Sequence, residues 1–279
     1  MTDQELEVFV AAKLHLFYQQ RLEKLQNITL TQVLKKNPYL FKAKGITNAS
    51  DFVENVLQAY LSSSEETVFG SIFFEPLALE VSRAKGGIKT GSTGVDIEYV
   101  SDTTHTAIAV KSSTNSQNAS AQSKQNAEFI KINQTVRAKG KAFDAILGYS
   151  YGRASGSLTG KIYRRLAGQA FWEELSGDSN FYLKILGAMK ESPAIHRKEY
   201  DVQRTRLGNR LTQGFALNFI TGDGEIDWEK LLRFNSGAGK PGNLLKVRVD
   251  SATGNSIVEE DKATEESLAE ESSEAEANE

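Results

Sequence analysis

The chain has 279 residues, a net charge of -3 and no cysteine, and 39% of its residues are hydrophobic. This composition is typical of a globular protein with one sizeable core, and the lack of cysteine excludes disulfides, thiol catalysis and thiolate metal sites. Because the only histidines (His15, His105 and His196) are widely separated, a multi-histidine zinc site is not expected. Any metal would be held by oxygen, which favours Mg²⁺.

The net charge hides an uneven distribution along the chain. Residues 250–279 carry eleven acids and one lysine, whereas residues 1–249 carry 32 basic and 25 acidic side chains, a net charge of +7. A basic body suits a polyanionic partner. No segment approaches the roughly 20 apolar residues that span a bilayer, and the acidic N-terminus does not have the pattern of a signal peptide. We therefore expect a cytoplasmic protein without a membrane partner.

Helices are predicted for the N-terminal part of the chain. Apolar residues recur at helical spacing over residues 3–26, and a second helix opens near Asn48. Residues 63–66 (Ser-Ser-Glu-Glu) predict an N-terminal cap for a further helix that runs to Glu75. Pro76 lacks an amide proton and should kink or restart that helix.

Two short strand patterns follow a glycine-rich segment at residues 86–94. Centring the turn between them on residues 102–103 gives three opposed pairs: Val100 with His105, Glu98 with Ala107, and Asp96 with Ala109. Because side chains alternate along a strand, one face then carries Asp96, Glu98, Ala109 and Lys111, and the other carries Ile97, Ile108 and Val110 into a core. A carboxylate beside an ammonium group on a rigid hairpin suits a site in which a bound metal ion and a lysine assist attack on a phosphate.

The later elements complete a strand–strand–helix–strand–strand order with helices at both ends. They are predicted at residues 119–139 (helix), 143–151 and 161–166 (strands), and 169–175, 180–190, 195–210 and 228–234 (helices). The Glu/Ser/Ala-rich end has few apolar residues, which predicts disorder. We predict an α/β protein with an N-terminal helical region (1–62), a core (63–192), a C-terminal helical region (193–249) and a disordered acidic tail (250–279).

This layout resembles the PD-(D/E)XK nuclease superfamily through Glu75, Asp96 and Ala109-Val110-Lys111. More specifically, the chain is similar to a small group of type II restriction endonucleases over about residues 1–235, in the hairpin and in four further segments: residues 67–70, 161–166, 169–172 and 223–232. The resemblance implies a restriction-endonuclease-like mixed β-sheet flanked by helices. It also implies a homodimer that hydrolyses double-stranded DNA at a palindromic site with Mg²⁺, leaving 5′-phosphate and 3′-hydroxyl ends, and a cognate DNA methyltransferase in the host.

The resemblance also assigns roles to single residues. Asp96 and Glu75 are the expected metal-binding acids, Val110 can coordinate through its backbone carbonyl, and Lys111 is the expected catalytic lysine beside the attacked phosphate. Most members of the superfamily have an acid where this chain has Ala109. Glu98 is a further candidate metal ligand that could replace it, and the alternative is a catalytically impaired protein.

The polar stretch after Lys111 is rich in amide and hydroxyl groups, which can read base edges, whereas basic side chains can contact phosphates. The candidate DNA-binding residues are Ser112, Ser113, Asn115, Gln117, Asn118, Gln122, Lys124 and Arg164. The plainer interpretation is a polar loop that caps a helix, together with ordinary surface charges. Two other functions stay open: a non-specific repair or phage DNA nuclease, and a DNA-binding protein of the same fold that does not cut.

Overall fold

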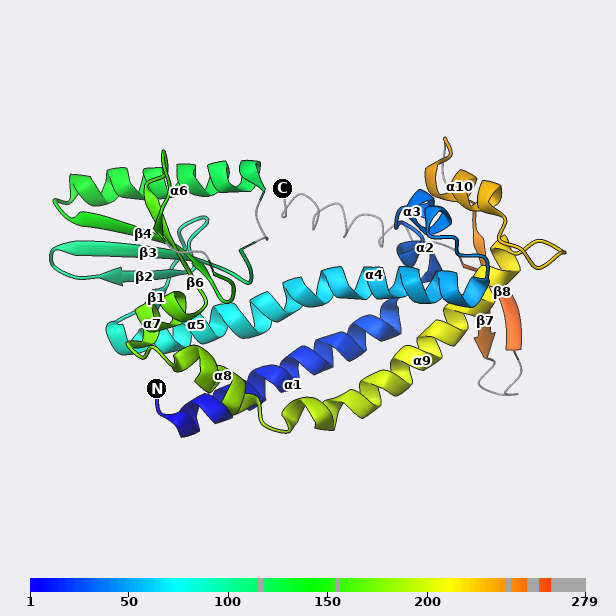
Figure 1. Cartoon of the computed structure of the whole chain (residues 1–279), viewed down its shortest axis with the longest axis horizontal. Coiled ribbons are helices and arrows are strands. Elements are labelled where there is room, and N and C mark those ends of the chain that lie inside the picture. The colour runs from blue at the N-terminus through cyan, green and yellow to red at the C-terminus, as the bar shows by residue number, and fades with distance from the viewer. Residues whose placement is uncertain (115–117, 154–155, 239–241, 250–255, 262–279) are drawn as a thin grey trace. The chain divides into compact units, whose positions relative to one another are not determined.

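The computed structural model describes residues 1–114, 118–153, 156–238, 242–249 and 256–261 (Figure 1). The chain divides into two compact units. The sheet unit comprises Met1–Gln19 and Glu66–His196, and the helical unit comprises Gln20–Glu65 and Arg197–Glu279. The divisions fall within or at the ends of three long helices: α1 (Asp3–Asn27), α4 (Ala49–Phe69) and α9 (Ser192–Phe219).

The sheet unit contains a six-stranded sheet in the order β1-β2-β3-β4-β6-β5. Its strands are β1 (Ile88–Lys89), β2 (Ile97–Val100), β3 (Thr104–Lys111), β4 (Ala142–Tyr149), β5 (Gly156–Ser157) and β6 (Tyr163–Ala167). β3 pairs with β4 and β4 with β6 in parallel, whereas the other neighbours are antiparallel. A parallel pair needs a long crossover, and helix α6 (Ala119–Ala138) supplies it between β3 and β4. The predicted mixed α/β fold is confirmed.

Side-chain alternation sends the two faces of the sheet into different cores. Ile97, Ile108 and Val110 enter one core with residues of α1, α5 (Glu75–Ser82), α7 (Gln169–Ser176) and α8 (Phe181–Met189). Ala107 and Ala109 enter the other core, against Phe129 of α6, which covers that face in Figure 1. The predicted period-two pattern of the hairpin is therefore confirmed.

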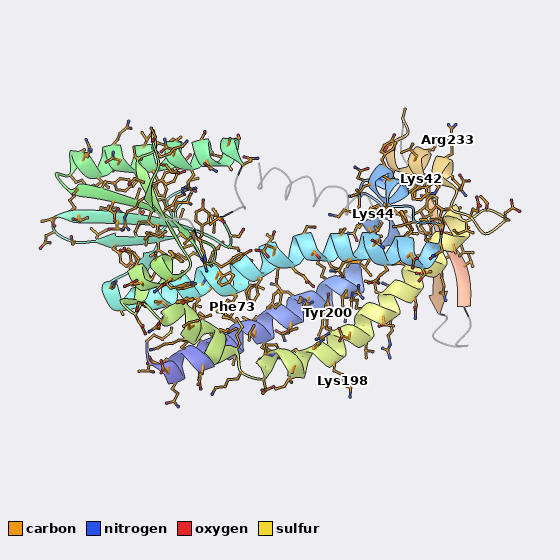
Figure 2. The ribbon with its side chains drawn as sticks, viewed as in Figure 1. Lys42, Lys44, Phe73, Lys198, Tyr200 and Arg233 are labelled. Atoms are coloured by element: carbon orange, nitrogen blue, oxygen red, sulfur yellow. The ribbon has the colours of Figure 1, made fainter. Side chains whose placement is uncertain are left out.

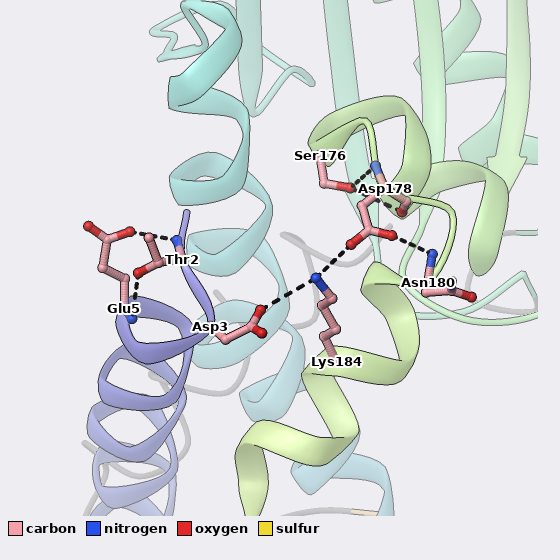
Figure 3. A network of polar contacts seen from close by, with 7 residues as sticks. All are labelled: Thr2, Asp3, Glu5, Ser176, Asp178, Asn180 and Lys184. Atoms are coloured by element: carbon pink, nitrogen blue, oxygen red, sulfur yellow. Dashed lines mark hydrogen bonds and ion pairs between the residues drawn. The ribbon is translucent and has the colours of Figure 1, made fainter.

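The first half of α1 belongs to the sheet unit because its apolar side chains Leu6, Val10 and Leu14 are buried there. A polar contact holds its beginning in place: Lys184 Nζ lies 2.9 Å from Asp178 Oδ2 and 3.4 Å from Asp3 Oδ1 (Figure 3). The two carboxylates raise the pKa of Lys184. The separate N-terminal region predicted for residues 1–62 is thus divided between the two units.

The helical unit packs parts of α1, α4 and α9 with three short helices, α2 (Leu30–Val33), α3 (Pro38–Ala43) and α10 (Trp228–Ser236), around one apolar core. Tyr200 links the long helices, because its hydroxyl donates to Glu65 Oε1 (2.8 Å), which also lies 2.7 Å from Arg21 (Tyr200 is labelled in Figure 2). None of the helices in the described part of the chain has the length and apolarity that crossing a bilayer requires.

A two-stranded hairpin, β7 (Leu244–Val249) and β8 (Ser256–Asp261), lies in the helical unit. The side-chain amide of buried Asn218 holds it, since Asn218 Nδ2 donates to Leu245 O and Leu245 N donates to Asn218 Oδ1, at 2.7 and 2.9 Å. The expectation of disorder from residue 250 onward was therefore wrong for Ser256–Asp261. Residues 250–255 and 262–279 lie outside the described residues.

The structure also corrects a predicted helix start. Residues 63–66 lie inside α4 and do not cap a new helix, and Ser63 Oγ donates to Ala59 O (3.1 Å) within that helix. After α4 the backbone continues through η1 (Gly70–Phe74), a π-helical segment, into α5. Because the hydroxyl of Ser63 bonds to a carbonyl one turn earlier in the same helix, the apparent capping motif does not mark the start of a new helix.

Candidate active site

The hairpin of β2 and β3 forms in the predicted register, with Val100 opposite His105 and Glu98 opposite Ala107. Ser101 N donates to Thr104 O at 2.9 Å and closes the turn. Lys111 is the last residue of β3 and is half-buried. Strand β3 therefore ends at Lys111, the residue predicted to be catalytic.

Asp96 precedes β2 by one residue and is fixed against β3 by two hydrogen bonds. Its backbone N donates to Ile108 O (2.9 Å), and its Oδ2 accepts from Val110 N (2.7 Å). Just before β2 begins, the Asp96 carboxylate thus accepts the hydrogen bond from Val110 N that a backbone carbonyl would accept in a paired strand. A short Asp side chain held in this way cannot swing far from the end of β3 that carries Lys111.

The backbone of Val110 faces the same side as Asp96. Ser150 N donates to Lys111 O (2.9 Å), so the polar backbone groups of Lys111 are directed toward β4. Because these groups alternate in direction along a strand, the N–H and C=O of Val110 are both directed toward the side of Asp96. The Val110 carbonyl is therefore placed to act as an oxygen ligand together with the Asp96 carboxylate.

Glu75 begins α5, directly after the π-helical segment η1, and is half-buried. Burial raises the pKa of its carboxyl, and the Asp96 carboxylate raises it further, whereas the ammonium groups of Lys111 and Lys89 lower it. Asp96, Lys111 and Lys89 are thus each within electrostatic range of Glu75. Single π-helical turns are frequent at functional sites because they change the direction in which a helix presents its side chains.

Gly70 allows the helix before Glu75 to approach the end of β3. A Cβ atom at Gly70 would lie 2.4 Å from Ser112 Oγ, closer than two such atoms can be. The structure also places η1 and α5 in contact with β3. The absence of a side chain at Gly70 therefore brings the segment that carries Glu75 next to the residues that follow Lys111.

Glu98 is engaged by the glycine-rich segment and by His105. Its Oε1 accepts from Thr90 Oγ1 (2.8 Å) and Ser92 Oγ (2.9 Å), and its Oε2 lies 3.3 Å from His105 Nε2. Both carboxylate oxygens thus have neighbours within the fold. This placement favours a positioning role, in which Glu98 holds the segment that leads into Asp96.

The predicted DNA-binding residues are placed differently from one another. Ser112 packs against Gly70, and Ser113 is hydrogen-bonded to Tyr151, whose hydroxyl donates to Glu66 (2.6 Å). Asn118 caps α6 by accepting from Ala121 N (2.8 Å), as in the plainer interpretation. Gln122 is half-buried and Lys124 is exposed on α6, and Asn115 and Gln117 lie outside the described residues.

Arg164 is held by carboxylates of its own unit. Its guanidinium donates to both oxygens of Asp144, at 2.9 and 3.0 Å, and to Glu174 Oε2 at 3.2 Å. The bonds to Asp144 are the main reason why the pKa of Arg164 lies above its ordinary value. The structure therefore gives Arg164 a role in joining β4, β6 and α7.

Two contributors to the site were not expected from the sequence. Lys89 lies opposite Ile97, the residue after Asp96, and its charge reaches Glu75. Gln125 is buried on α6 and donates to Gly94 O (2.6 Å). Together with Glu98, Gln125 holds the glycine-rich segment at residues 86–94 in place. Only a prediction that β1 pairs with β2 could have indicated that Lys89 lies near the site.

The donor set fits a hard cation. Two carboxylates, Asp96 and Glu75, and the carbonyl of Val110 offer oxygen alone, and Mg²⁺ is usually bound by one or two carboxylates with water and substrate phosphate. Among the residues that the structure describes, no group of three His, Cys, Asp or Glu side chains could hold a metal ion. Any cation here would therefore depend on backbone, water and substrate oxygens for its other ligands.

The comparisons with known proteins agree with this fold. A family model described as Type II restriction endonuclease EcoO109I matches residues 4–197, whereas no curated protein matches the chain significantly. The chain belongs to the EcoO109I family of type II restriction endonucleases. Membership of this family indicates an endonuclease that acts on DNA. The matched range, residues 4–197, includes all the site residues.

Ala109 provides a test of whether an acid is missing from the site. Ala109 is 0% exposed and packs in an apolar cluster with Phe129 and Tyr149. We expect Ala109→Glu to lower the free energy of unfolding by about 3 kcal/mol or more, since it buries an unpaired carboxylate, and to give no gain in DNA cleavage.

Thermal unfolding and cleavage assays on Ala109→Glu and Ala109→Gln check this expectation, because glutamine has the same size without the charge. A loss of stability in the glutamine variant as large as that in the glutamate variant would assign the effect to size. Faster cleavage by Ala109→Glu than by the wild type would contradict the prediction and indicate that the natural site is impaired.

Proposed function

We propose that the protein is a Mg²⁺-dependent type II restriction endonuclease that hydrolyses both strands of double-stranded DNA at a palindromic site as a homodimer. The observation that carries this proposal is the bond from Val110 N to Asp96 Oδ2 (2.7 Å) beside Lys111, with Glu75 within electrostatic range. A palindromic site requires two copies of one active site related by a two-fold axis, which is the reason for the homodimer.

Each residue of the site has a distinct task in the proposed reaction. Asp96, Glu75 and the Val110 carbonyl would hold Mg²⁺, which would polarise the phosphate and make a water more acidic. The Lys111 ammonium positions the attacking water and offsets the negative charge that develops on the phosphate. Water attacks phosphorus and loses a proton to solvent, the bond to the 3′ oxygen breaks, and that oxygen takes a proton from a solvent water. The products carry 5′-phosphate and 3′-hydroxyl ends.

Lys89 is the second cation near Glu75 and extends the positive charge of the site to β1. Its exposed position suits a contact to a phosphate next to the attacked one, which would fix the register of the duplex without reading its sequence. Glu98 and Gln125 support this arrangement indirectly, because they hold the segment between Lys89 and Asp96.

A plasmid digest with Mg²⁺ or with EDTA tests the proposal. Discrete fragments that appear only with Mg²⁺ are the expected result. A smear would favour a non-specific nuclease, and a mobility shift without cutting would favour a DNA-binding protein, for which the non-acidic Ala109 is the specific argument. Cutting in EDTA would contradict the metal requirement. The host of such an enzyme would also need a DNA methyltransferase that protects the same sequence.

A further inference from the structure

The helical unit contains a lysine-rich stretch that the proposed active site does not use. Residues 24–50 include five lysines and no aspartate or glutamate. We call residues 24–50 the lysine segment. It covers the end of α1, the short helices α2 and α3 and the beginning of α4. Its lysines are Lys24, Lys35, Lys36, Lys42 and Lys44.

Five other cations of this unit form ion pairs with carboxylates in the described residues. In the described residues, ion pairs join Arg21 to Glu65, Arg197 to Asp201, Arg204 to Glu54, Arg233 to Glu229 and Lys246 to Glu259. Within that part of the chain, no such pair involves Lys36, Lys42 or Lys44. The positive charges of Lys36, Lys42 and Lys44 are thus not neutralised by an ion pair within the described residues of this unit.

Aromatic rings hold these lysines in place. Lys42 Nζ lies 5.1 Å from the centre of the Trp228 ring, and Lys44 Nζ lies 5.4 Å from that of Phe41 (both lysines are labelled in Figure 2). Lys36 Nζ donates to Ser63 Oγ at 3.2 Å. A lysine whose stem already lies on a ring loses less side-chain entropy when its ammonium group meets an anion.

The polar side chains beside these lysines are already used by the backbone. Asn37 Oδ1 accepts from Leu40 N (3.3 Å), and Asn48 Oδ1 accepts from Asp51 N (2.8 Å), so both amides cap helices. Amide side chains that cap helices are not free to read the edges of bases. The surface therefore offers point charges and little sequence recognition, which is the chemistry that binds a phosphate backbone.

We propose that the lysine segment is a second DNA-binding surface, which contacts phosphates of the duplex outside the bases that are recognised and cut, with Lys42 and Lys44 as its main contacts. The proposal rests on the proposed function only in that DNA is the partner. It places part of the affinity for DNA in the helical unit, independent of the sequence of the duplex and of the divalent cation.

The test compares Lys42→Gln/Lys44→Gln with Lys13→Gln/Lys198→Gln, a control with the same change in charge. Lys13 Nζ also lies over a ring, at 5.3 Å from the centre of Phe9, and Lys198 is exposed on α9. Fluorescence anisotropy gives the Kd of each protein for a labelled duplex of random sequence, in EDTA, over a series of salt concentrations. Each phosphate contact contributes about 0.9 to the slope of log Kd against log salt concentration.

We expect Lys42→Gln/Lys44→Gln to lower this slope by about 2 and each single variant by about 1, with an unchanged melting temperature, while the control keeps the wild-type slope. A wild-type slope in the double variant would overturn the proposal. An equal loss in the control would do so too, since it would indicate a general effect of charge. An altered sedimentation coefficient with an unchanged slope would assign the surface to contacts between protein chains instead.

The plasmid digest separates this proposal from the proposed function. If the wild type binds the labelled duplex but does not cut plasmid with Mg²⁺, the proposed function fails and the salt dependence still decides the role of Lys42 and Lys44. If the wild type cuts and the double variant binds as the wild type does, only the proposal for the lysine segment fails.

Discussion

Asp96→Asn is expected to lower the rate of DNA cleavage by at least about 10²–10³-fold while the protein still binds DNA. The amide oxygen of asparagine can still accept the hydrogen bond from Val110 N, so the hairpin should keep its structure. The negative charge that would hold Mg²⁺ beside Lys111 is lost. Single-turnover cleavage measures the rate, and anisotropy with a labelled duplex measures the binding.

Asp102→Asn is the matched control for this variant. Asp102 is an exposed aspartate in the turn of the same hairpin, so its substitution makes the same change in charge a few residues away. It should cut at the wild-type rate. Wild-type cutting by Asp96→Asn would remove Asp96 from the site, and an equal loss in both variants would indicate an effect on the hairpin rather than on the chemistry.

Glu75→Gln is expected to lower cleavage by about 10²-fold or more and to raise the thermal stability of the metal-free protein. Burial is the main reason why the pKa of Glu75 is raised, followed by the charge of Asp96. A carboxyl whose pKa is higher in the folded than in the unfolded state favours folding while it is protonated, and this contribution is lost as the pH rises through the folded pKa. At neutral pH, glutamine therefore removes an unfavourable charge.

Melting curves in EDTA and in Mg²⁺ separate the two effects of Glu75→Gln. The variant should melt higher than the wild type in EDTA at neutral pH, and the difference should shrink as the pH falls below the unfolded pKa. Mg²⁺ should stabilise the wild type more than the variant, because a ligand that binds only the folded state shifts its stability. Glu80→Gln on the same helix is the control, since Glu80 pairs with Arg83 at 3.1 Å. Equal stabilisation of Glu75→Gln and the wild type by Mg²⁺ would exclude Glu75 as a ligand.

The sequence predicted the parts of the site that depend on local pattern. A polar turn between two apolar alternations was sufficient to give the register of β2 and β3, which the structure confirms. The same alternation separated Ile97 and Ile108 from Ala107 and Ala109, and these residues do enter different cores. Strand pairing near a tight turn follows from a few adjacent residues, so it can be read without knowledge of the rest of the chain.

Polar side chains were harder to interpret, because their partners lie on other elements of the fold. Glu98 was a candidate metal ligand, but its nearest groups are Thr90, Ser92 and His105. Arg164 was a candidate phosphate contact, and it pairs with Asp144, 20 residues earlier, and with Glu174. The packing of whole helices and strands decides which acidic side chain pairs with a given basic side chain. Composition and residue spacing do not predict this pairing.

By itself, then, the amino-acid sequence determined the hairpin, its alternation and the succession of helices around a sheet, since these follow from neighbouring residues and from the two periodicities of the backbone. Only the tertiary structure decided that Glu75 approaches Asp96 and Lys111. That approach depends on a π-helical segment, on the missing side chain of Gly70 against Ser112, and on the burial of α5 against the sheet. The last two are contacts between segments remote in sequence, and they stabilise the arrangement only once the core has formed.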